Sequence, residues 1–410
     1  MADSETYTTE ASILDDMIVA HINGQMLAWA RKRAGFEIGR LAKGTVTIEK
    51  LTAWENGQEN PSQTQAIALA EKLGISYAML FMPTVPPPDI PVIPDLRTVS
   101  GQRLTNPSLD FREVLNDTTA RQEWVRDERI DEGVSPLPFV GKFSIEDDPK
   151  SVAADMRGAL QLTKEDRSQC RDYEEFIKHL VTRAETIGVL VMRSAVVRHA
   201  TNRPLSVKEF RGFALADAFA PVVFVNDADA KAAQVFTIAH ELTHIWIGAD
   251  GVSDRKPNQK NDSKNAIELF CDKVAAELLV PEAELRNLWR GGTSLENSKR
   301  MAAHFRVSTL VALRRAKDLE LIPFDTFIAQ VESEYDRFRE IDRKKREKQK
   351  KEERQGGNFW ASFELRNGKA FNATVTASLR SRRVSFTEAA TLMGVTVAAA
   401  VRYLRRVGAH

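Results

Sequence analysis

Apolar positions along residues 22–82 recur at helical spacing and predict a compact bundle of short helices. Met26, Leu27 and Ala30 would share one face of a first helix, and Leu51 and Trp54 one face of a later helix. Glycines separate the apolar stretches, as residues that end helices commonly do. The pattern is typical of a helix-turn-helix domain, and Trp54 is expected in its core.

The pattern changes after residue 100, where longer helices and short strands are both expected. Helical periodicity dominates residues 108–190. Three runs rich in β-branched and aromatic residues predict strands at 189–193, 210–216 and 221–226. Further helices are expected at Ala232–Ile247 and Ala266–Leu279. We expect the strand at 221–226 to lie at a sheet edge, where an extended peptide could pair with it.

Polar and charged stretches mark the remaining segments. Six prolines between Pro83 and Pro94 predict a semi-rigid extended linker. Residues 297–322 carry a second helix-turn-helix pattern, and residues 333–354 are so charged that a solvated helix or tether is expected. The last fifty or so residues predict a further helical pair. Its arginines are interpreted as a solvated basic face, with nucleic-acid contact as the alternative: Arg380, Arg382, Arg383, Arg402, Arg405 and Arg406.

Composition is typical of a globular protein and limits the expected cellular location. Of 410 residues, 58 are Lys or Arg and 57 are Asp or Glu, so the overall charge indicates no particular partner. Cys170 and Cys271 form neither a disulfide framework nor a zinc-ribbon spacing. The polar N-terminal segment does not resemble a signal peptide, and no apolar run is long enough to span a membrane. A cytoplasmic location is the expectation.

The strongest chemical signal is His240-Glu241-x-x-His244, an HExxH motif within the helix expected at Ala232–Ile247. Residues four apart share a helix face, so both imidazoles can bind one zinc ion, which keeps a water in catalytic sites. Glu241 can take a proton from that water and pass it to the leaving amine of a peptide. The alternative is a helix with two surface histidines. Three residues suited by type to stabilising an oxyanion are not assigned this role: Tyr173, His199 and Arg211.

The third metal ligand has several candidates. A His-x-x-Gly-x-x-His extension fails because Ile247 and Asp250 stand where glycine and histidine are needed. Asp250 or Asp254 could bind after a turn. Glu268 is the stronger candidate, because it lies 24 residues after His244 on a second helix that could supply a carboxylate.

Other residues of that second helix have simpler interpretations. Asp272 lies one turn beyond Glu268 and could orient a metal ligand. Cys271 is interpreted as a small buried residue, with a soft metal ligand as the alternative. Glu277 is expected to be solvated.

The segment FTIAHELTHIWIG and the segment from Glu268 to Pro281 resemble the ImmA/IrrE family of metallopeptidases. The pieces FRGFALAD and PVVFVND also look like that family. The unit from QMLAWARKRAGF to LGISYAMLF resembles the Cro/repressor-type (XRE) helix-turn-helix that is often fused to it. The resemblance covers residues 22–325.

This resemblance implies a zinc-dependent peptidase with His240, His244 and Glu268 as ligands and Glu241 as the base. Family members cleave repressor-type transcription regulators and thereby release stress or mobile-element genes. The same role is implied here, with Zn²⁺ as cofactor and a repressor- or antitoxin-like protein as substrate. Family members often carry Ala-Asn where this chain has Cys271 and Asp272, so the resemblance does not imply the orienting role of Asp272.

The second helix of the helix-turn-helix would contact DNA through residues near its start. The exposed candidates are Thr45, Thr47, Lys50 and Thr52. Residues 22–82 hold seven basic and five acidic residues, and this net charge of +2 is small for a DNA-binding domain. DNA, another protein and a second copy of the chain in a homodimer all remain candidate partners.

Two functions are consistent with these patterns. The first is a regulatory zinc endopeptidase that cleaves a repressor- or antitoxin-like protein. The second is a DNA- or protein-binding transcription regulator, or antitoxin-like protein, whose zinc site is structural or inactive. Glu241 favours the enzyme, since a structural metal site needs no base. No membrane partner is expected.

The expected fold is α+β and mainly α. Its parts are a flexible N-terminus (1–21), a five-helix Cro/repressor-like helix-turn-helix domain (22–82), a Pro-rich linker (83–100), a zincin-like metallopeptidase domain with a small sheet (101–296), a helix-turn-helix-like segment (297–330), a charged helix or tether (331–357) and a small helical C-terminal region (358–410).

Overall fold

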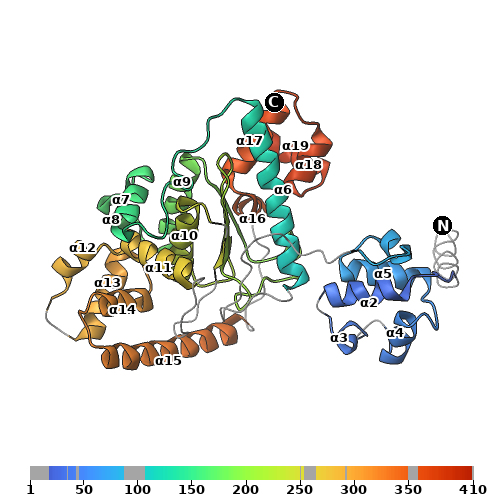
Figure 1. Cartoon of the computed structure of the whole chain (residues 1–410), viewed down its shortest axis with the longest axis horizontal. Coiled ribbons are helices and arrows are strands. Elements are labelled where there is room, and N and C mark those ends of the chain that lie inside the picture. Colours follow the sequence, from blue (N-terminus) through green and yellow to red (C-terminus); the bar gives the residue numbers. More distant parts are fainter. Residues whose placement is uncertain are drawn as a thin grey trace. The chain divides into compact units, whose positions relative to one another are not determined.

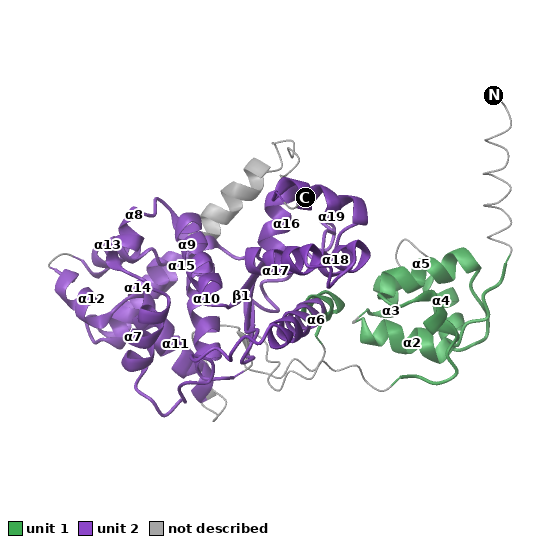
Figure 2. Ribbon diagram, turned by 90° about the horizontal axis from the view of Figure 1, so that it is seen from above, with its two compact units in different colours: residues 1–92, 104–116 green, residues 93–103, 117–410 purple. Residues whose placement is uncertain are grey.

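The computed structural model of the chain describes residues 18–34, 36–42, 46–86, 107–249, 251–253, 265–290, 293–349 and 359–408. These residues belong to two compact units (Figure 2). Unit 1 comprises residues 1–92 and 104–116, and unit 2 comprises residues 93–103 and 117–410. Most of the predicted Pro-rich linker lies outside the described residues. In the described part, no helix is long and apolar enough to cross a membrane.

Unit 1 is a bundle of short helices built around a small apolar core. The helices are α2 (Gly24–Arg33), α3 (Ile38–Ala42), α4 (Ile48–Glu55), α5 (Gln63–Leu73) and the 3-10 helix η1 (Tyr77–Phe81). Trp54 is 2% exposed in the core, as predicted. Gly24 is needed where α2 crosses α4, because a Cβ there would lie 2.5 Å from the carbonyl oxygens of Trp54 and Glu55.

Unit 2 contains a four-stranded sheet whose order is β1-β3-β2-β4. Its strands are β1 (Leu190–Ser194), β2 (Gly212–Leu215), β3 (Val222–Asn226) and β4 (Gly251–Ser253). β1 runs parallel to β3, whereas β2 is antiparallel to both β3 and β4. The three strands predicted from the sequence are present, but the expectation that 221–226 is an edge strand was wrong. β3 pairs on both sides, so it cannot accept a peptide by strand addition.

Helices cover both sides of this sheet (Figures 1 and 2). On one side lie α9 (Tyr173–Thr186), α10 (Lys231–Trp246) and α11 (Asn265–Leu279). On the other lie α6 (Leu109–Asp131), α16 (Phe359–Asn367) and α17 (Lys369–Arg380). The Gln122 side chain of α6 donates hydrogen bonds to the carbonyl oxygens of Leu215 and Ala220, which fixes this helix against the connection from β2 to β3.

Other helices extend unit 2 on the α11 side and at the C-terminal end. They are α7 (Pro149–Ala159), α8 (Lys164–Gln169), α12 (Glu282–Leu288), α13 (Ser294–Phe305), α14 (Thr309–Asp318), α15 (Phe324–Gln349), α18 (Phe386–Met393) and α19 (Val397–Arg406). The second predicted helix-turn-helix pattern corresponds to α13 and α14. The predicted charged segment is helical as far as Gln349. The observed architecture is mainly α with a small sheet, as expected.

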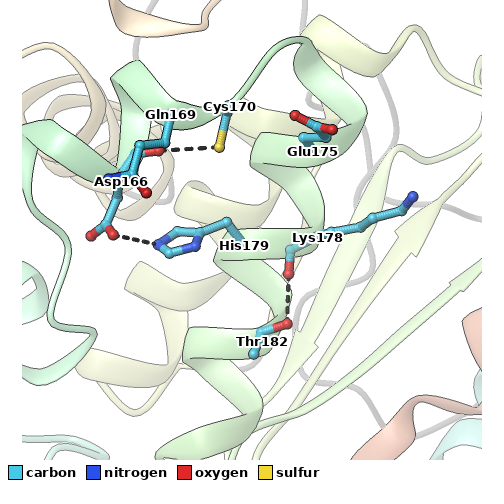
Figure 3. Close-up of a pocket in the computed structure, with 7 residues that line it drawn as sticks. All are labelled: Asp166, Gln169, Cys170, Glu175, Lys178, His179 and Thr182. Atoms are coloured by element: carbon cyan, nitrogen blue, oxygen red, sulfur yellow. Dashed lines mark hydrogen bonds and ion pairs between the residues drawn. The ribbon is translucent and has the colours of Figure 1, made fainter.

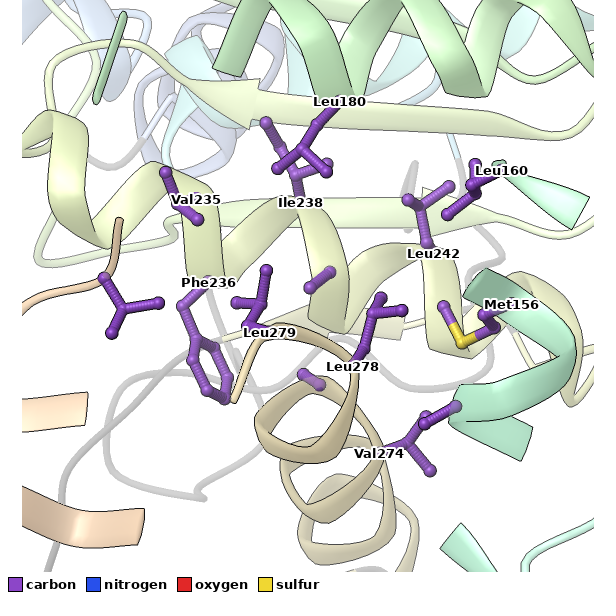
Figure 4. Close-up of a cluster of buried hydrophobic side chains, with 14 of the residues drawn as sticks. Met156, Leu160, Leu180, Val235, Phe236, Ile238, Leu242, Val274, Leu278 and Leu279 are labelled. Carbon is purple, nitrogen blue, oxygen red and sulfur yellow. The ribbon is translucent and has the colours of Figure 1, made fainter. Parts of the chain in front are cut away.

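The core of unit 2 surrounds α10 (Figure 4). Val235, Ile238 and Leu242 of α10 are fully buried. Val274 and Leu278 of α11 pack into the same cluster. At the end of α10, Trp246 stacks on Phe139 with ring centroids 4.4 Å apart and donates a 2.9 Å hydrogen bond to Asp155 Oδ1. Helix α10 is therefore held rigidly, which matters because it carries the HExxH motif.

Candidate metal centre

The two histidines of the motif lie on one buried face of α10. Every residue of this helix from Gln234 to Trp246 is buried, and no glycine or proline interrupts it. An apolar helix with such complete burial is expected at the centre of a domain. His240 and His244 are each 1% exposed, and their Nε2 atoms lie 3.2 Å apart. The spacing of four residues thus brings both rings to one point, as predicted.

Helix α11 brings Glu268 to the same point. Its Oε2 atom lies 3.1 Å from His240 Nε2, and its Oε1 atom lies 3.2 Å from His244 Nε2. The ligand atoms of these three residues all lie within 4.8 Å of one another. Asp250 and Asp254, the alternative third ligands, lie outside the described residues.

The separations between these atoms fit a zinc ion. Zinc–nitrogen and zinc–oxygen bonds near 2.1 Å in a tetrahedral site place neighbouring ligand atoms roughly 3.4 Å apart. The three separations between ligand atoms, from 3.1 to 3.2 Å, are slightly below that value. Two imidazoles and one carboxylate also leave a fourth position free, which is the arrangement of catalytic zinc sites.

The electrostatics of the cluster favour positive charge. Burial lowers the pKa of His240, but Glu268 and Asp272 outweigh burial and raise it to about 10. Burial likewise opposes protonation of His244, yet Cys271 and Glu268 raise its pKa well above the usual range. For Glu268, the two imidazoles overcome burial and lower the carboxyl pKa below its usual range. A divalent cation satisfies the same demand for positive charge, because metal ligands bind in their deprotonated forms.

Two further residues of α11 contact the rings. Asp272 Oδ1 lies 3.0 Å from His240 Nδ1, the ring atom that points away from Glu268. Carboxylates in this position commonly fix the tautomer and orientation of a metal-binding histidine. Cys271 is fully buried and contributes to the environment of His244. Among the described residues, the cluster of ligand atoms that could hold one metal ion consists of His240, His244 and Glu268 and includes neither Asp272 nor Cys271.

Glu241 is completely buried and packs against strand β2. Sequence reasoning missed the residue that makes this packing feasible, which is Gly212. A Cβ atom at Gly212 would lie 3.1 Å from Glu241 Oε1, 2.6 Å from Thr237 Cγ2 and 2.8 Å from the carbonyl oxygen of Phe224. Only a glycine lets the sheet approach α10 this closely. The signal in the sequence was the glycine within an otherwise bulky strand pattern.

The three residues considered for an oxyanion role have other contacts. Arg211 forms an ion pair with Asp229. The Tyr173 hydroxyl donates to the carbonyl oxygen of Val307, and His199 Nε2 lies 3.0 Å from that of Gly394. The interpretation of Glu277 as solvated was wrong. It is 6% exposed and pairs with Arg315, because α14 packs a guanidinium against this end of α11.

A separate pocket lies on α8 and α9 (Figure 3). It is lined by Asp166, Gln169, Cys170, Glu175, Lys178, His179 and Thr182. His179 Nε2 lies 3.4 Å from Asp166 Oδ1, and the Cys170 thiol donates to the Asp166 carbonyl oxygen. Burial raises the pKa of Cys170, which disfavours the nucleophilic thiolate. The pocket shares no residue with the metal centre.

In unit 1, the residues predicted to contact DNA have different local roles. Thr47 precedes α4, and its hydroxyl accepts a hydrogen bond from the Lys50 N–H. The Thr52 hydroxyl donates to the Ile48 carbonyl oxygen within the helix. Lys50 is exposed. Thr45 lies outside the described residues.

Comparison with protein families found two matches in the chain. Residues 184–317 match the peptidase M78 family, described as the IrrE N-terminal-like domain, and residues 27–80 match a helix-turn-helix family. The chain therefore contains a metallopeptidase-like domain and, before it, an XRE-type helix-turn-helix domain, as predicted. The first match includes β1 to β3, α10 and α11. A comparison with curated proteins found no match.

Proposed function

We propose that the chain is a zinc-dependent endopeptidase with a regulatory role. The observation that carries this proposal is the convergence of His240, His244 and Glu268, with Glu241 next to the first of them on the same buried helix. The match to a peptidase family over residues 184–317 supports it.

His240, His244 and Glu268 would hold the metal, and Glu241 would transfer the proton. When bound, a divalent metal supplies Lewis acidity that acidifies a water molecule and polarises a peptide carbonyl. Glu241 takes a proton from the attacking water and delivers it to the leaving nitrogen, so that the peptide bond breaks into a carboxylate and an amine. Asp272 holds the His240 ring in orientation. Nitrogen and carboxylate ligands in this number favour zinc over Mg²⁺ or Ca²⁺.

The domain that accompanies the peptidase domain in the chain suggests the class of substrate. An XRE-type helix-turn-helix precedes it in the chain, and a domain of this kind can bring the peptidase to DNA or to a protein of related fold. We infer that the substrate is a repressor- or antitoxin-like protein. In unit 1, Lys50 is the exposed cation at the start of α4, where a DNA contact would fall.

A second function is favoured by one observation. His240, Glu241 and His244 are almost completely buried, as residues of a structural metal site usually are. The alternative is therefore a transcription regulator or antitoxin-like protein that binds DNA or protein and carries a structural zinc ion.

Metal analysis and substrate profiling together separate the two functions. We expect about one zinc per chain in the wild-type protein and in Glu241→Gln, and none in His244→Ala. New protein N-termini should appear when the wild-type protein is added to a cell extract, and they should be absent with Glu241→Gln. Glu165→Gln removes an exposed carboxylate on α8 and serves as the matched control. Zinc in the wild-type protein without any cleavage would favour the regulator with a structural zinc ion. Absence of zinc from the wild-type protein would reject the endopeptidase and favour a DNA- or protein-binding regulator with an inactive site.

A further inference from the structure

The C-terminal helices α17, α18 and α19 form a third helix-turn-helix unit. Helix α18 ends at Gly394, which adopts the left-handed conformation with φ 67°. Thr396 then caps α19, where its hydroxyl accepts a hydrogen bond from the Ala399 N–H. Two helices joined by a three-residue turn with a glycine have the connection that is typical of helix-turn-helix motifs. Neither family match includes these residues.

Helix α19 is strongly amphipathic. Ala399, Ala400, Tyr403 and Leu404 are buried against the other C-terminal helices. The opposite face exposes cations: Arg402, Arg405 and Arg406. In the described part of the chain, no carboxylate forms an ion pair with any of these three arginines. Their charge is therefore directed to solvent.

The charge of this region contrasts with that of unit 1. Residues 369–408 contain seven basic residues and one acidic residue, Glu388, which is engaged in the capping box of α18. Residues 22–82 of unit 1 have a net charge of only +2, and Glu55 neutralises Arg31. The strongest candidate for an electrostatic nucleic-acid contact is thus at the C-terminal end and not in the domain that matches the helix-turn-helix family.

We propose that the exposed face of α19 binds the phosphate backbone of double-stranded DNA without reading its sequence. Arginines contact phosphates and release counterions, which supplies affinity for any duplex. In helix-turn-helix proteins the start of the second helix reads base edges. Here that start exposes Val397 and Ala398, which have no side-chain hydrogen-bonding group. The arrangement therefore provides attachment without specificity.

The α19 face is fixed to the peptidase body. The carbonyl oxygen of Leu392 accepts a hydrogen bond from Arg121 Nε of α6, and that of Gly394 lies 3.0 Å from His199 Nε2. Arg383 pairs with Glu128 of α6. DNA attached to α19 would therefore hold the whole of unit 2. The inference does not depend on peptidase activity.

The test measures duplex binding by the full-length chain as a function of salt. The variant Arg402→Gln/Arg405→Gln/Arg406→Gln removes the three charges and keeps helix propensity nearly unchanged. The control Lys178→Gln/Lys208→Gln/Lys299→Gln removes three exposed charges elsewhere in unit 2. The N-terminal helix-turn-helix is intact in both. Fluorescence anisotropy with a labelled 20-base-pair duplex of arbitrary sequence reports the affinity, and thermal unfolding checks the fold.

We expect the arginine variant to bind about tenfold more weakly or worse in low salt, while the lysine control binds like the wild-type chain. The slope of log affinity against log salt concentration should become shallower by about 3, roughly one unit per phosphate contact. Duplexes rich in A·T and in G·C should bind with similar affinity. The proposal is overturned if the arginine variant keeps its affinity and slope, or if the control loses as much. The proposal is also overturned if the arginine variant still binds the duplex like the wild-type chain but no longer binds a polyglutamate probe. That result would indicate an acidic protein partner.

Discussion

Replacement of Gly212 by alanine would test the packing that holds Glu241 in place. The added Cβ atom would lie 2.6 Å from Thr237 Cγ2 and 2.8 Å from the Phe224 carbonyl oxygen. Ordinary contacts between such atoms are about 3.5–4.0 Å. The Phe224 carbonyl is part of the backbone of β3 and cannot rotate away as a side chain could. Either the sheet or α10 must therefore move. Overpacking of this kind costs about 1–3 kcal/mol.

The matched control is Gly158→Ala on α7, where a Cβ atom would meet nothing within 4 Å. Alanine is favoured over glycine in helices by about 1 kcal/mol, so this variant should be as stable as the wild-type chain or more so. Thermal unfolding of unit 2 should shift down by roughly 2–4 °C per kcal/mol in Gly212→Ala. Zinc content should persist, since no ligand is altered, whereas cleavage should fall because Glu241 is displaced.

A double variant separates the two clashes. Thr237→Ser removes Cγ2 and leaves the clash with the Phe224 carbonyl oxygen, so Gly212→Ala/Thr237→Ser should regain part of the lost stability. If Gly212→Ala unfolds at the wild-type temperature and cleaves normally, then the close approach of β2 to α10 is not what positions Glu241, and the reasoning fails.

Three further perturbations have defined outcomes. Trp246→Phe keeps an aromatic ring but removes the hydrogen bond to Asp155, so denaturant titration should show a loss of about 1 kcal/mol. Arg315→Met leaves the buried Glu277 carboxylate without its partner and should cost about 3–5 kcal/mol, whereas the double replacement with Glu277→Leu should recover most of that loss. Glu268→Gln should weaken zinc binding, measured by competition with a chelator, while circular dichroism stays unchanged; wild-type zinc affinity in this variant would remove Glu268 from the ligand set.

The sequence predicted the elements that carry the site because their patterns are local. A spacing of four residues on a helix brings His240 and His244 together whatever surrounds them. The position of Glu268 depends on which second helix crosses α10. Helix α11 is that helix, and it brings Glu268 Oε2 to His240 Nε2 as expected. The sheet order could not be read in the same way. β3 became central because β1 pairs with it in parallel and β2 in antiparallel, and strand composition does not encode that choice.

The structure also differs from the sequence-based expectations at strand β4 and at Glu277, because neither feature is encoded in a local pattern. Strand β4 is only three residues long, so it carries too little pattern to be recognised. Glu277 looked like a solvated residue because its partner Arg315 is distant in sequence and meets it only after α14 has packed on α11. Spacing within one element was enough to place His240 and His244, whereas the sheet order and the environment of Glu277 depend on which elements become neighbours.

The C-terminal helices also close the sheet at strand β1. The Leu190 N–H bonds to the Pro221 carbonyl oxygen, so the next residue, Val191, directs its backbone groups to the outer edge. Gly368, with φ 79°, sits against that edge: a Cβ there would lie 2.5 Å from the Val191 carbonyl oxygen. A chain cut at the boundary of the peptidase match would leave this edge open to pair with other molecules. The C-terminal region thus covers the β1 edge, and we expect a peptidase domain produced without it to aggregate more readily than the whole chain.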